Sequence, residues 1–372
     1  MKILIISMPY TGHITPTFNL TKALLELDSS VDYLTSENWR DIVEKIGAGH
    51  IAYSDSDSLQ ITDIYNEVYN KALGIGNRYD AIIYDELFFL GKRLCEKLEI
   101  PAIRYFPCIA INRNLMRVMT HGHGFMGIFR FAIVRKMWTK KICRPLKLKI
   151  SDWTVEVTDN PPDRNIVFVP EWFQPELESF PSDEYKFVGT SVYKDSYADI
   201  EIEKSNLPLI YMALGTIDNN KANLYNQCLE MFAGKEARLI LAVGDKIDIG
   251  TLGEIPSNCT VYEYAPQKEI LEKSDLFITH GGMNSIAESI QFGVPMLVAP
   301  MSNDQPINAK QIQRLGIGRE IDILTLSADE LWSNIISVTS DSMMKQNIRR
   351  YQLQASKNDG GRIAATYVLE EK

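Results

Sequence analysis

An alternation of short apolar runs with helical patterns recurs along this chain and constrains its fold more than any other feature. Near the N-terminus, the apolar run 2–7 is followed by a turn rich in Pro, Gly and Thr and by a helical pattern that reaches about Leu27. Further apolar runs lie at 31–35, 81–84 and 101–105. Continuous apolar strands separated by helices are typical of a parallel sheet built from βαβ units. The sequence therefore predicts an α/β fold.

The same alternation restarts in the second half of the chain, after polar, proline-containing stretches that we interpret as linkers, at 159–164 and 191–208. The strands predicted there are 209–214, 238–243, 275–279 and 294–299. A chain of 372 residues is too long for one ordinary core. We therefore expect two Rossmann-like domains facing each other across a cleft. Their predicted extents are 1–204, with a C-terminal helix at about 350–372 packing back on it, and 205–349.

The composition excludes several classes of protein. Hydrophobic residues make up 45% and charged residues 23%, as in a globular protein. The net charge of −9 and the pI near 5.3 lack the basic footprint of a nucleic-acid partner. No apolar run approaches the length of about 18 residues that spans a membrane, and the five cysteines contain no CxxC pair. We expect a cytoplasmic protein, either a monomer or a homodimer.

The segment from His280 to Gln305 carries the most specific chemistry. A strand runs into a pair of glycines and then a helix start, where free N–H groups and the positive helix end favour a pyrophosphate. A carboxylate one turn further on suits ribose hydroxyls, and a neighbouring carboxylate and amide suit a sugar. The pair Ser285 and Glu288 also fits a capping box, which would make both structural. The candidates are His280, Gly282, Asn284, Ser285, Glu288, Asp304 and Gln305.

A candidate general base follows the first predicted strand. His13 lies in the turn after 2–7, and Asp85 ends the strand 81–84, so both belong at the carboxyl edge of the first sheet. Histidine titrates near neutrality, and a carboxylate can fix its tautomer and stabilise the imidazolium. The alternatives are that His13 only caps or packs in its turn, and that Asp85 is the N-cap of the next helix.

These motifs resemble the signature of the family-1 glycosyltransferases of the GT-B fold, in particular the bacterial macrolide-type UDP-glycosyltransferase branch. That signature runs H-x-G-x-N-S-x-x-E, then G-V-P, then P-x-x-x-D-Q, and the segment from His280 to Gln305 matches it at those spacings. The sequences Y-A-P-Q at 264–267, G-T at 215–216, F-V-G at 187–189 and G-H-x-x-P at 12–16 resemble further landmarks of the family.

The resemblance implies a role for each part of the motif. His280, Ser285 and the backbone near Asn284 would hold the diphosphate, and Glu288 the ribose. The remaining donor-binding residues would be Gly12, Gly215, Thr216, Tyr264, Ala265, Gln267, Gly282, Asp304 and Gln305. Tyr264 stands where many relatives have a stacking Trp, which leaves thymidine diphosphate open beside uridine diphosphate. The resemblance implies no cofactor and no metal, with a UDP-sugar, preferably UDP-glucose, as co-substrate.

The implied activity is inverting transfer of a sugar to a hydroxyl of a small hydrophobic acceptor, such as a macrolide or a phenol, with His13 as base and Asp85 as its partner. Met8, Phe88 and Phe106 are candidate acceptor-lining residues that could equally be core. The alternatives are a lipid glycosyltransferase at a membrane surface and a non-catalytic nucleotide-sugar-binding auxiliary protein. A nicotinamide oxidoreductase is disfavoured because no GxGxxG follows the first strand.

One stretch departs from the acidic average of the chain. Residues 113–149 contain ten Lys or Arg, no Asp or Glu, and interleaved apolar residues. We hypothesise peripheral contact with the inner face of an anionic membrane, or with an acidic or lipid-like acceptor. The alternative is an ordinary solvated helix face beside pocket-lining aromatic residues.

Overall fold

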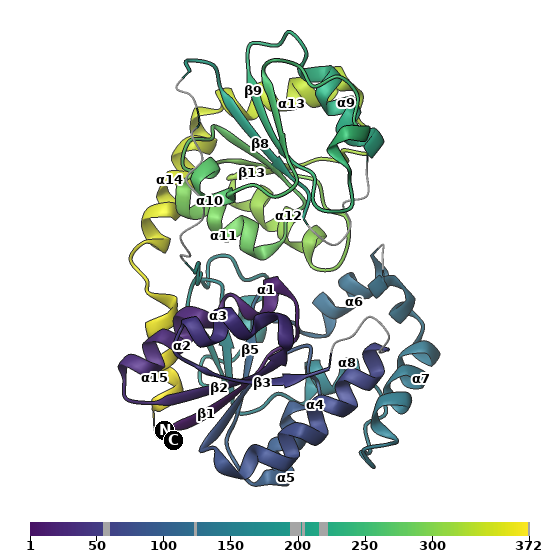
Figure 1. The fold of residues 1–372 in the computed structure, drawn as a ribbon, viewed down its shortest axis with the longest axis vertical. Helices are drawn as coiled ribbons and strands as arrows, with labels where there is room; N and C mark the ends of the chain where they lie inside the picture. The colour runs from purple at the N-terminus through teal and green to yellow at the C-terminus, as the bar shows by residue number, and fades with distance from the viewer. Residues whose placement is uncertain (55–59, 123–124, 194–201, 203–204, 216–221, 371–372) are drawn as a thin grey trace. The chain divides into compact units, whose positions relative to one another are not determined.

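The computed structural model describes residues 1–54, 60–122, 125–193, 202, 205–215 and 222–370 (Figure 1). The chain forms two compact units. The first comprises Met1–His121, Phe125–Tyr193 and Asn358–Lys372, and the second comprises Lys194–Lys357 together with Gly122–Gly124. The boundary predicted between residues 204 and 205 adjoins residues outside the described ranges, and it stays a prediction.

The first unit is built on a seven-stranded parallel sheet in the order β3-β2-β1-β4-β5-β6-β7. In the register of the central strands, Ile6 lies opposite Tyr84, so the carboxyl ends of β1 and β4 are neighbours. The strands are β1 (Lys2–Ile6), β2 (Ser30–Ser36), β3 (Gly49–Tyr53), β4 (Ala81–Asp85), β5 (Ala102–Phe106), β6 (Arg164–Val167) and β7 (Tyr185–Phe187).

Helices connect these strands. The α-helices are α1 (Thr11–Ile14), α2 (Thr17–Glu26), α3 (Arg40–Lys45), α4 (Ile61–Ile75), α5 (Gly91–Leu98), α6 (Arg113–His121), α7 (Ala132–Cys143) and α8 (Trp153–Asp159). The short 3₁₀ turns are η1 (Glu37–Trp39), η2 (Gly76–Arg78), η3 (Phe125–Arg130) and η4 (Leu177–Ser179).

The last helix, α15 (Gly360–Leu369), completes the core of the first unit against α2. The two helices approach so closely that a Cβ on Gly361 would lie 2.6 Å from the backbone carbonyl carbon of Asn19. Apolar side chains of α15, among them Ala364, Ala365 and Val368, are buried in the same cluster as Leu24. The C-terminal helix therefore belongs to the first unit by packing, although it follows the second in sequence.

The second unit contains a six-stranded parallel sheet in the order β10-β9-β8-β11-β12-β13. Its strands are β8 (Leu209–Ala213), β9 (Arg238–Ala242), β10 (Cys259–Tyr262), β11 (Leu276–Thr279), β12 (Met296–Val298) and β13 (Gly318–Glu320). Its helices are α9 (Ala222–Phe232), α10 (Gln267–Leu271), α11 (Met283–Phe292), α12 (Gln305–Leu315), α13 (Ala328–Ser340) and α14 (Ser342–Ala355), with the 3₁₀ turn η5 (Ile249–Thr251). The predicted α/β fold with two Rossmann-like sheets is confirmed.

Two predicted segments are wrong in placement. Residues 159–164, predicted as linker, join α8 to β6 inside the first unit. The C-terminal return begins at Asn358 and not near 350, because α14 packs on α11, where the side chain of Gln352 donates to the backbone carbonyl of Gln291 at 2.7 Å. In the part of the chain that the structure describes, no helix is long and apolar enough to cross a membrane.

Candidate active site

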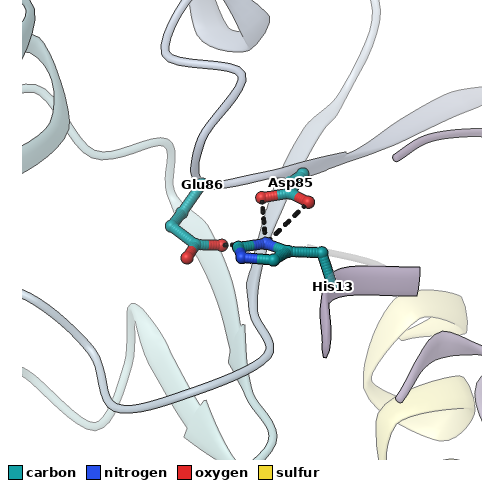
Figure 2. A group of neighbouring side chains, drawn as sticks. All are labelled: His13, Asp85 and Glu86. Atoms are coloured by element: carbon teal, nitrogen blue, oxygen red, sulfur yellow. Dashed lines mark hydrogen bonds and ion pairs between the residues drawn. The ribbon is translucent and has the colours of Figure 1, made fainter. Parts of the chain in front are cut away.

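A histidine and an aspartate meet at the carboxyl edge of the first sheet. His13 lies in α1, directly after β1, and Asp85 is the last residue of β4. The Nδ1 atom of His13 is 3.0 Å from each carboxylate oxygen of Asp85 (Figure 2). The His13 side chain is 20% exposed, whereas that of Asp85 is fully buried. Asp85 thus holds Nδ1 of the ring, while part of the ring stays accessible.

Asp85 receives an unusually complete set of hydrogen bonds. Beside the His13 ring, the backbone N–H of Leu87 donates to Oδ1 at 2.9 Å, and the Tyr105 hydroxyl donates to Oδ2 at 3.2 Å. The backbone N–H of Met8 lies 3.4 Å from Oδ2. Burial alone would raise the pKa of Asp85, but the charge and hydrogen bond of His13 and the other donors outweigh it and lower the pKa. Asp85 is therefore the ionised partner of the His13 ring.

Neither of the alternatives for this pair describes its geometry. The helix after β4 is α5, which begins at Gly91 with Leu90 at its N-cap, so Asp85 is not an N-cap residue. The His13 ring does more than fill a turn, because its Nδ1 contacts a residue 72 positions away. The arrangement is the one that a general base and its orienting carboxylate require.

A second carboxyl group, which the sequence analysis missed, lies beside this pair. Glu86 is 3% exposed, and its Oε2 is 3.9 Å from Nδ1 of His13 (Figure 2). Burial and the negative charge of Asp85 raise the pKa of Glu86 well above its ordinary value. A sequence signal existed in the adjacent pair Asp85-Glu86, but nothing in the sequence indicated that both would be buried.

His13, Asp85 and Glu86 each offer a ligand atom within 4.8 Å of the others. These atoms already serve the hydrogen bonds between His13 and Asp85 and those that Asp85 accepts from backbone and hydroxyl donors. We therefore interpret the cluster as a hydrogen-bonded base. That the protein needs no metal stays a prediction.

In the second unit, α11 begins where the sequence predicted a phosphate-binding helix start. Its N-cap is Gly282, which has no side chain to cap the first turn. The capping-box alternative is wrong, because Ser285 is the third residue of α11 and Glu288 lies a further turn along. The first-turn N–H groups and the positive end of a ten-residue helix are suited to an anion.

The His280 ring is flanked by two glycines that the sequence analysis selected. A Cβ on Gly282 would lie 2.5 Å from its Nε2, and one on Gly215 would lie 2.9 Å from the same atom. Gly215 also has a φ of +83°, which favours glycine. Only glycine fits beside the ring at either position without displacing it. Thr216, the next candidate, lies outside the described residues.

A hydrogen-bonded pair links α10 to α11. The Gln267 side-chain amide donates to Oε2 of Glu288 at 2.6 Å and lies 3.5 Å from Oγ of Ser285. Burial raises the pKa of Glu288, against the opposing effect of the Gln267 hydrogen bond. The sequence analysis assigned these residues to one ligand, and the structure brings their side chains together.

The candidate sugar-binding residues lie at the start of α12. Oε1 of Gln305 accepts the backbone N–H groups of Met301 and Ser302 at 2.7 and 3.0 Å, which shapes the loop. Oδ2 of Asp304 accepts from the Asn308 amide at 2.8 Å, and the same amide donates to the carbonyl of Gly281 at 2.9 Å. Asn308 is fully buried and was missed. It ties the loop after β12 to the glycine turn after β11.

The remaining candidates differ in exposure. Tyr264 is 59% exposed, so its ring face is available for stacking, and Ala265 is partly buried in the same loop. Gly12 is exposed in α1, and a Cβ there would meet no atom within 4 Å. Which nucleotide groups these residues contact stays a prediction.

The three candidate acceptor-lining residues are all buried. Met8 is 1% exposed, and Phe88 and Phe106 are fully buried. Phe88 stacks on Tyr65, with ring centroids 6.2 Å apart, and Phe106 stacks on Tyr185 at 6.4 Å. Their packing fits the core alternative, and an acceptor-lining role for them stays a prediction.

Comparison with known proteins connects this geometry with a family. Residues 245–356 match the family described as UDP-glucoronosyl and UDP-glucosyl transferase. The chain is 29% identical over 385 aligned positions to the NDP-glycosyltransferase YjiC of Bacillus subtilis (strain 168), covering 98% of this chain and 96% of that protein. It is 23% identical to the oleandomycin glycosyltransferase of Streptomyces antibioticus, covering 99% and 90%. The crystal structure of the kitacinnamycin glycotransferase matches with a TM-score of 0.82 at 26% identity, covering 99% and 97%.

The fold, the first-unit histidine pair and the second-unit glycine and helix motif define a glycosyltransferase of the GT-B fold. Within that class, residues 245–356 match the UDP-glucoronosyl and UDP-glucosyl transferases, and almost the whole chain is similar to YjiC and to the oleandomycin enzyme, a macrolide-type glycosyltransferase.

Proposed function

We propose that this protein is an inverting glycosyltransferase that moves glucose from UDP-glucose to a hydroxyl group of a small apolar acceptor, such as a macrolide or a phenol. One observation carries the proposal: a partly accessible His13 ring is held through Nδ1 by a buried, ionised Asp85 at 3.0 Å. A neutral histidine oriented in this way is suited to remove a proton from an alcohol.

In this mechanism His13 donates its Nδ1 hydrogen to Asp85, so Nε2 carries the free lone pair. Nε2 takes the acceptor's hydroxyl proton as the oxygen attacks the anomeric carbon. The bond from that carbon to the diphosphate breaks on the opposite face, which inverts the anomeric configuration, and UDP leaves. Asp85 stabilises the imidazolium that forms.

The second unit would hold the donor. The uncapped start of α11, beside His280 and Gly282, is suited to the diphosphate. We assign the ribose hydroxyls to Glu288, and the sugar to Asp304 and Gln305. One relative is described as an NDP-glycosyltransferase, so thymidine diphosphate remains the alternative nucleotide.

The deciding experiment incubates the purified protein with UDP-glucose or TDP-glucose and a panel of macrolide, phenolic and lipid alcohols, and reads products by mass spectrometry. We expect one hexose to be added to a macrolide or phenol. The His13→Ala variant, which lacks Nε2, should form no such product. The anomeric configuration of the product, measured by NMR, tests inversion. UDP binding without transfer to any alcohol would instead support the alternative of a non-catalytic, nucleotide-sugar-binding auxiliary protein.

A second candidate function, glycosylation of a lipid at a membrane surface, is favoured by the exposed surface of η3 and α7. Four large apolar side chains there are exposed: Ile128 by 46%, Phe131 by 51%, Ile133 by 70% and Met137 by 66%. Ile133 and Met137 are one helical turn apart and therefore share a face of α7.

Basic residues accompany this apolar surface. Lys136 and Lys140 are exposed on the same face of α7, and neither has a carboxylate within 4 Å in the described part of the chain. By contrast, Arg113 and Arg135 are paired with Asp159 and Asp152. Apolar groups flanked by unpaired cations complement the surface of an anionic membrane.

Liposome cosedimentation tests this candidate. Binding to vesicles that contain phosphatidylglycerol, but not to pure phosphatidylcholine, would support it, provided that Ile133→Ser combined with Met137→Ser abolishes binding. A matched control is Met343→Ser, which changes another exposed methionine, 62% exposed and in the second unit. Equal sedimentation with both vesicle types, or no binding at low salt, would contradict it.

A further inference from the structure

The buried carboxyl of Glu86 has no place in the mechanism above, although it lies beside His13. Its Oε2 is 3.9 Å from Nδ1 of His13, on the ring edge that also faces Asp85 (Figure 2). An unused ionisable group in such a position has an electrostatic effect on the base whatever its charge state.

The hydrogen bonds around the two neighbouring carboxyls are strongly unequal. Asp85 accepts from the His13 ring, the Leu87 and Met8 backbones and the Tyr105 hydroxyl. Oε2 of Glu86 has no hydrogen-bond partner within the described residues when the group is treated as an acceptor. Its Oε1 receives the Cys108 thiol, a weak donor, at 3.9 Å.

The positive charge of Arg104 favours the ionised form of Glu86, but burial and the charge of Asp85 outweigh it and raise the pKa of Glu86. Arg104 is buried nearby, but its guanidinium donates to Asn165, to the Val157 carbonyl and to Tyr185. The groups that face Glu86 from the surrounding elements are His13 of α1, Asp85 of β4, Arg104 and Tyr105 of β5, Cys108 after β5 and Tyr65 of α4. An ionised Glu86 would thus be a buried charge with few donors, which is costly.

We propose that Glu86 carries a proton in the resting protein and donates it in a hydrogen bond to Asp85, so that a single negative charge faces His13. This inference rests on the proposed role of His13 as the base. The unpartnered oxygen of Glu86 then becomes a satisfied donor. Glu86 is a positioning residue: it acts on the base through Asp85 and touches no reacting atom.

The hydrogen bond from Glu86 would have two effects. It adds one more donor to a carboxylate that must stay ionised to hold the His13 ring. It also keeps a second negative charge away from the ring, where such a charge at 3.9 Å would attract the imidazolium even through water. The proton on Glu86 therefore sets how readily His13 accepts and releases the acceptor's proton.

Infrared difference spectroscopy tests the position of the proton directly. At pH 7 the spectrum of the wild type minus that of Glu86→Gln should contain the C=O band of a protonated carboxylic acid. A matched control is Glu156→Gln, which removes a buried carboxylate paired with Arg93 at 2.7 Å and should give carboxylate bands only. A Glu86 difference that shows carboxylate bands would overturn the inference.

Activity provides the second measurement. Glu86→Leu, which removes the donor, should lower kcat by about 10- to 100-fold, and Glu86→Gln, whose amide can still donate, should recover most of that loss. The acidic limb of the kcat/KM pH profile of Glu86→Gln should keep the wild-type midpoint. A fall of that midpoint, or a Gln variant as inactive as the Leu variant, would contradict the proposal.

The infrared and kinetic measurements distinguish a failure of the inference about Glu86 from a failure of the proposed function. If the wild type transfers no sugar, the infrared arm still decides where the proton lies. If Glu86→Leu does not fold, as judged by its thermal unfolding, the Gln and wild-type spectra remain decisive.

Discussion

The Nδ1 atom of His13 lies 3.0 Å from both carboxylate oxygens of Asp85, a residue 72 positions further along the chain. The contact forms because β1 and β4 are adjacent and parallel, with Ile6 opposite Tyr84. Residues that follow two neighbouring parallel strands meet at one edge of the sheet, so the topology positions the base and its partner before any local packing does so.

This contact gives the first prediction. Replacing Asp85 by Asn removes the charge that holds the His13 tautomer, and kcat should fall by about 100- to 10,000-fold while UDP affinity stays within about twofold. Steady-state kinetics with an accepted alcohol and calorimetry with UDP provide the measurements. Asp80→Asn is the matched control, because Asp80 adjoins the opposite end of β4 and accepts from the backbone of Lys2. If the Asp85→Asn enzyme kept the wild-type kcat, the Asp85 carboxylate would have no role in the mechanism.

The second prediction concerns Glu288 and the ribose. Glu288→Ala should weaken UDP binding by about 10- to 100-fold, because hydroxyl hydrogen bonds to a carboxylate would be lost. Calorimetry with UDP and with its 2′,3′-dideoxy analogue distinguishes the cause: the analogue should bind both proteins alike. Glu272→Ala, an exposed glutamate at the end of α10, serves as control. Equal weakening for the analogue would mean that Glu288 acts through Gln267 and not on the ribose.

The third prediction uses the space around His280. Gly282→Ala would place a Cβ 2.5 Å from Nε2 of that ring, so the ring must move, and UDP affinity should fall by roughly tenfold. The φ of Gly282 is −67°, so backbone strain plays no part. Gly74→Ala is the control, because a Cβ there meets no atom within 4 Å, and alanine in a helix should leave stability equal or slightly higher. Unchanged UDP affinity in Gly282→Ala would exclude the ring from donor binding.

The fourth prediction is a pH dependence of stability. The folded-state pKa of Glu86 lies above its ordinary 4.5, so the unfolded chain loses this proton first and stability falls as pH rises from about 4.5. Asp85 has a folded-state pKa below 3.8, so its contribution is complete above that pH and is lost only in stronger acid. The thermal unfolding midpoint of Glu86→Gln should therefore match the wild type near pH 4 and exceed it at pH 7. A difference that does not change with pH would contradict the assignment.

The sequence predicted the fold class and the pair His13 and Asp85 because both depend on strand order, which apolar runs and turns reveal. It missed β6 and β7, since these strands have four and three residues and β6 contains Arg164 and Asn165. Asn165 is nevertheless fully buried, where it accepts from Arg104. A short strand that contains a buried polar residue has no apolar run to mark it.

Residues that matter through burial could not be predicted in the same way. The motif Ser285-x-x-Glu288 fits both a capping box and a ligand site, and only the position of Gly282 at the N-cap decided between them. Glu86 and Asn308 have ordinary surface residue types, so nothing in their identity indicated that they are 3% exposed and fully buried. For Asn308 the signal was weak but present: it follows Asp304 by one helical turn.

The return of α15 to α2 has a consequence for how the protein is made. The first 193 residues leave the ribosome before about 165 residues of the second unit, and the helix that closes their core emerges only after these. At typical translation rates this interval is on the order of ten to forty seconds. Throughout it, the apolar face of α2 around Leu20 and Leu24, which Ala364 and Ala365 later cover, is without its native partner. The nascent first unit therefore exposes this apolar face until α15 has been made.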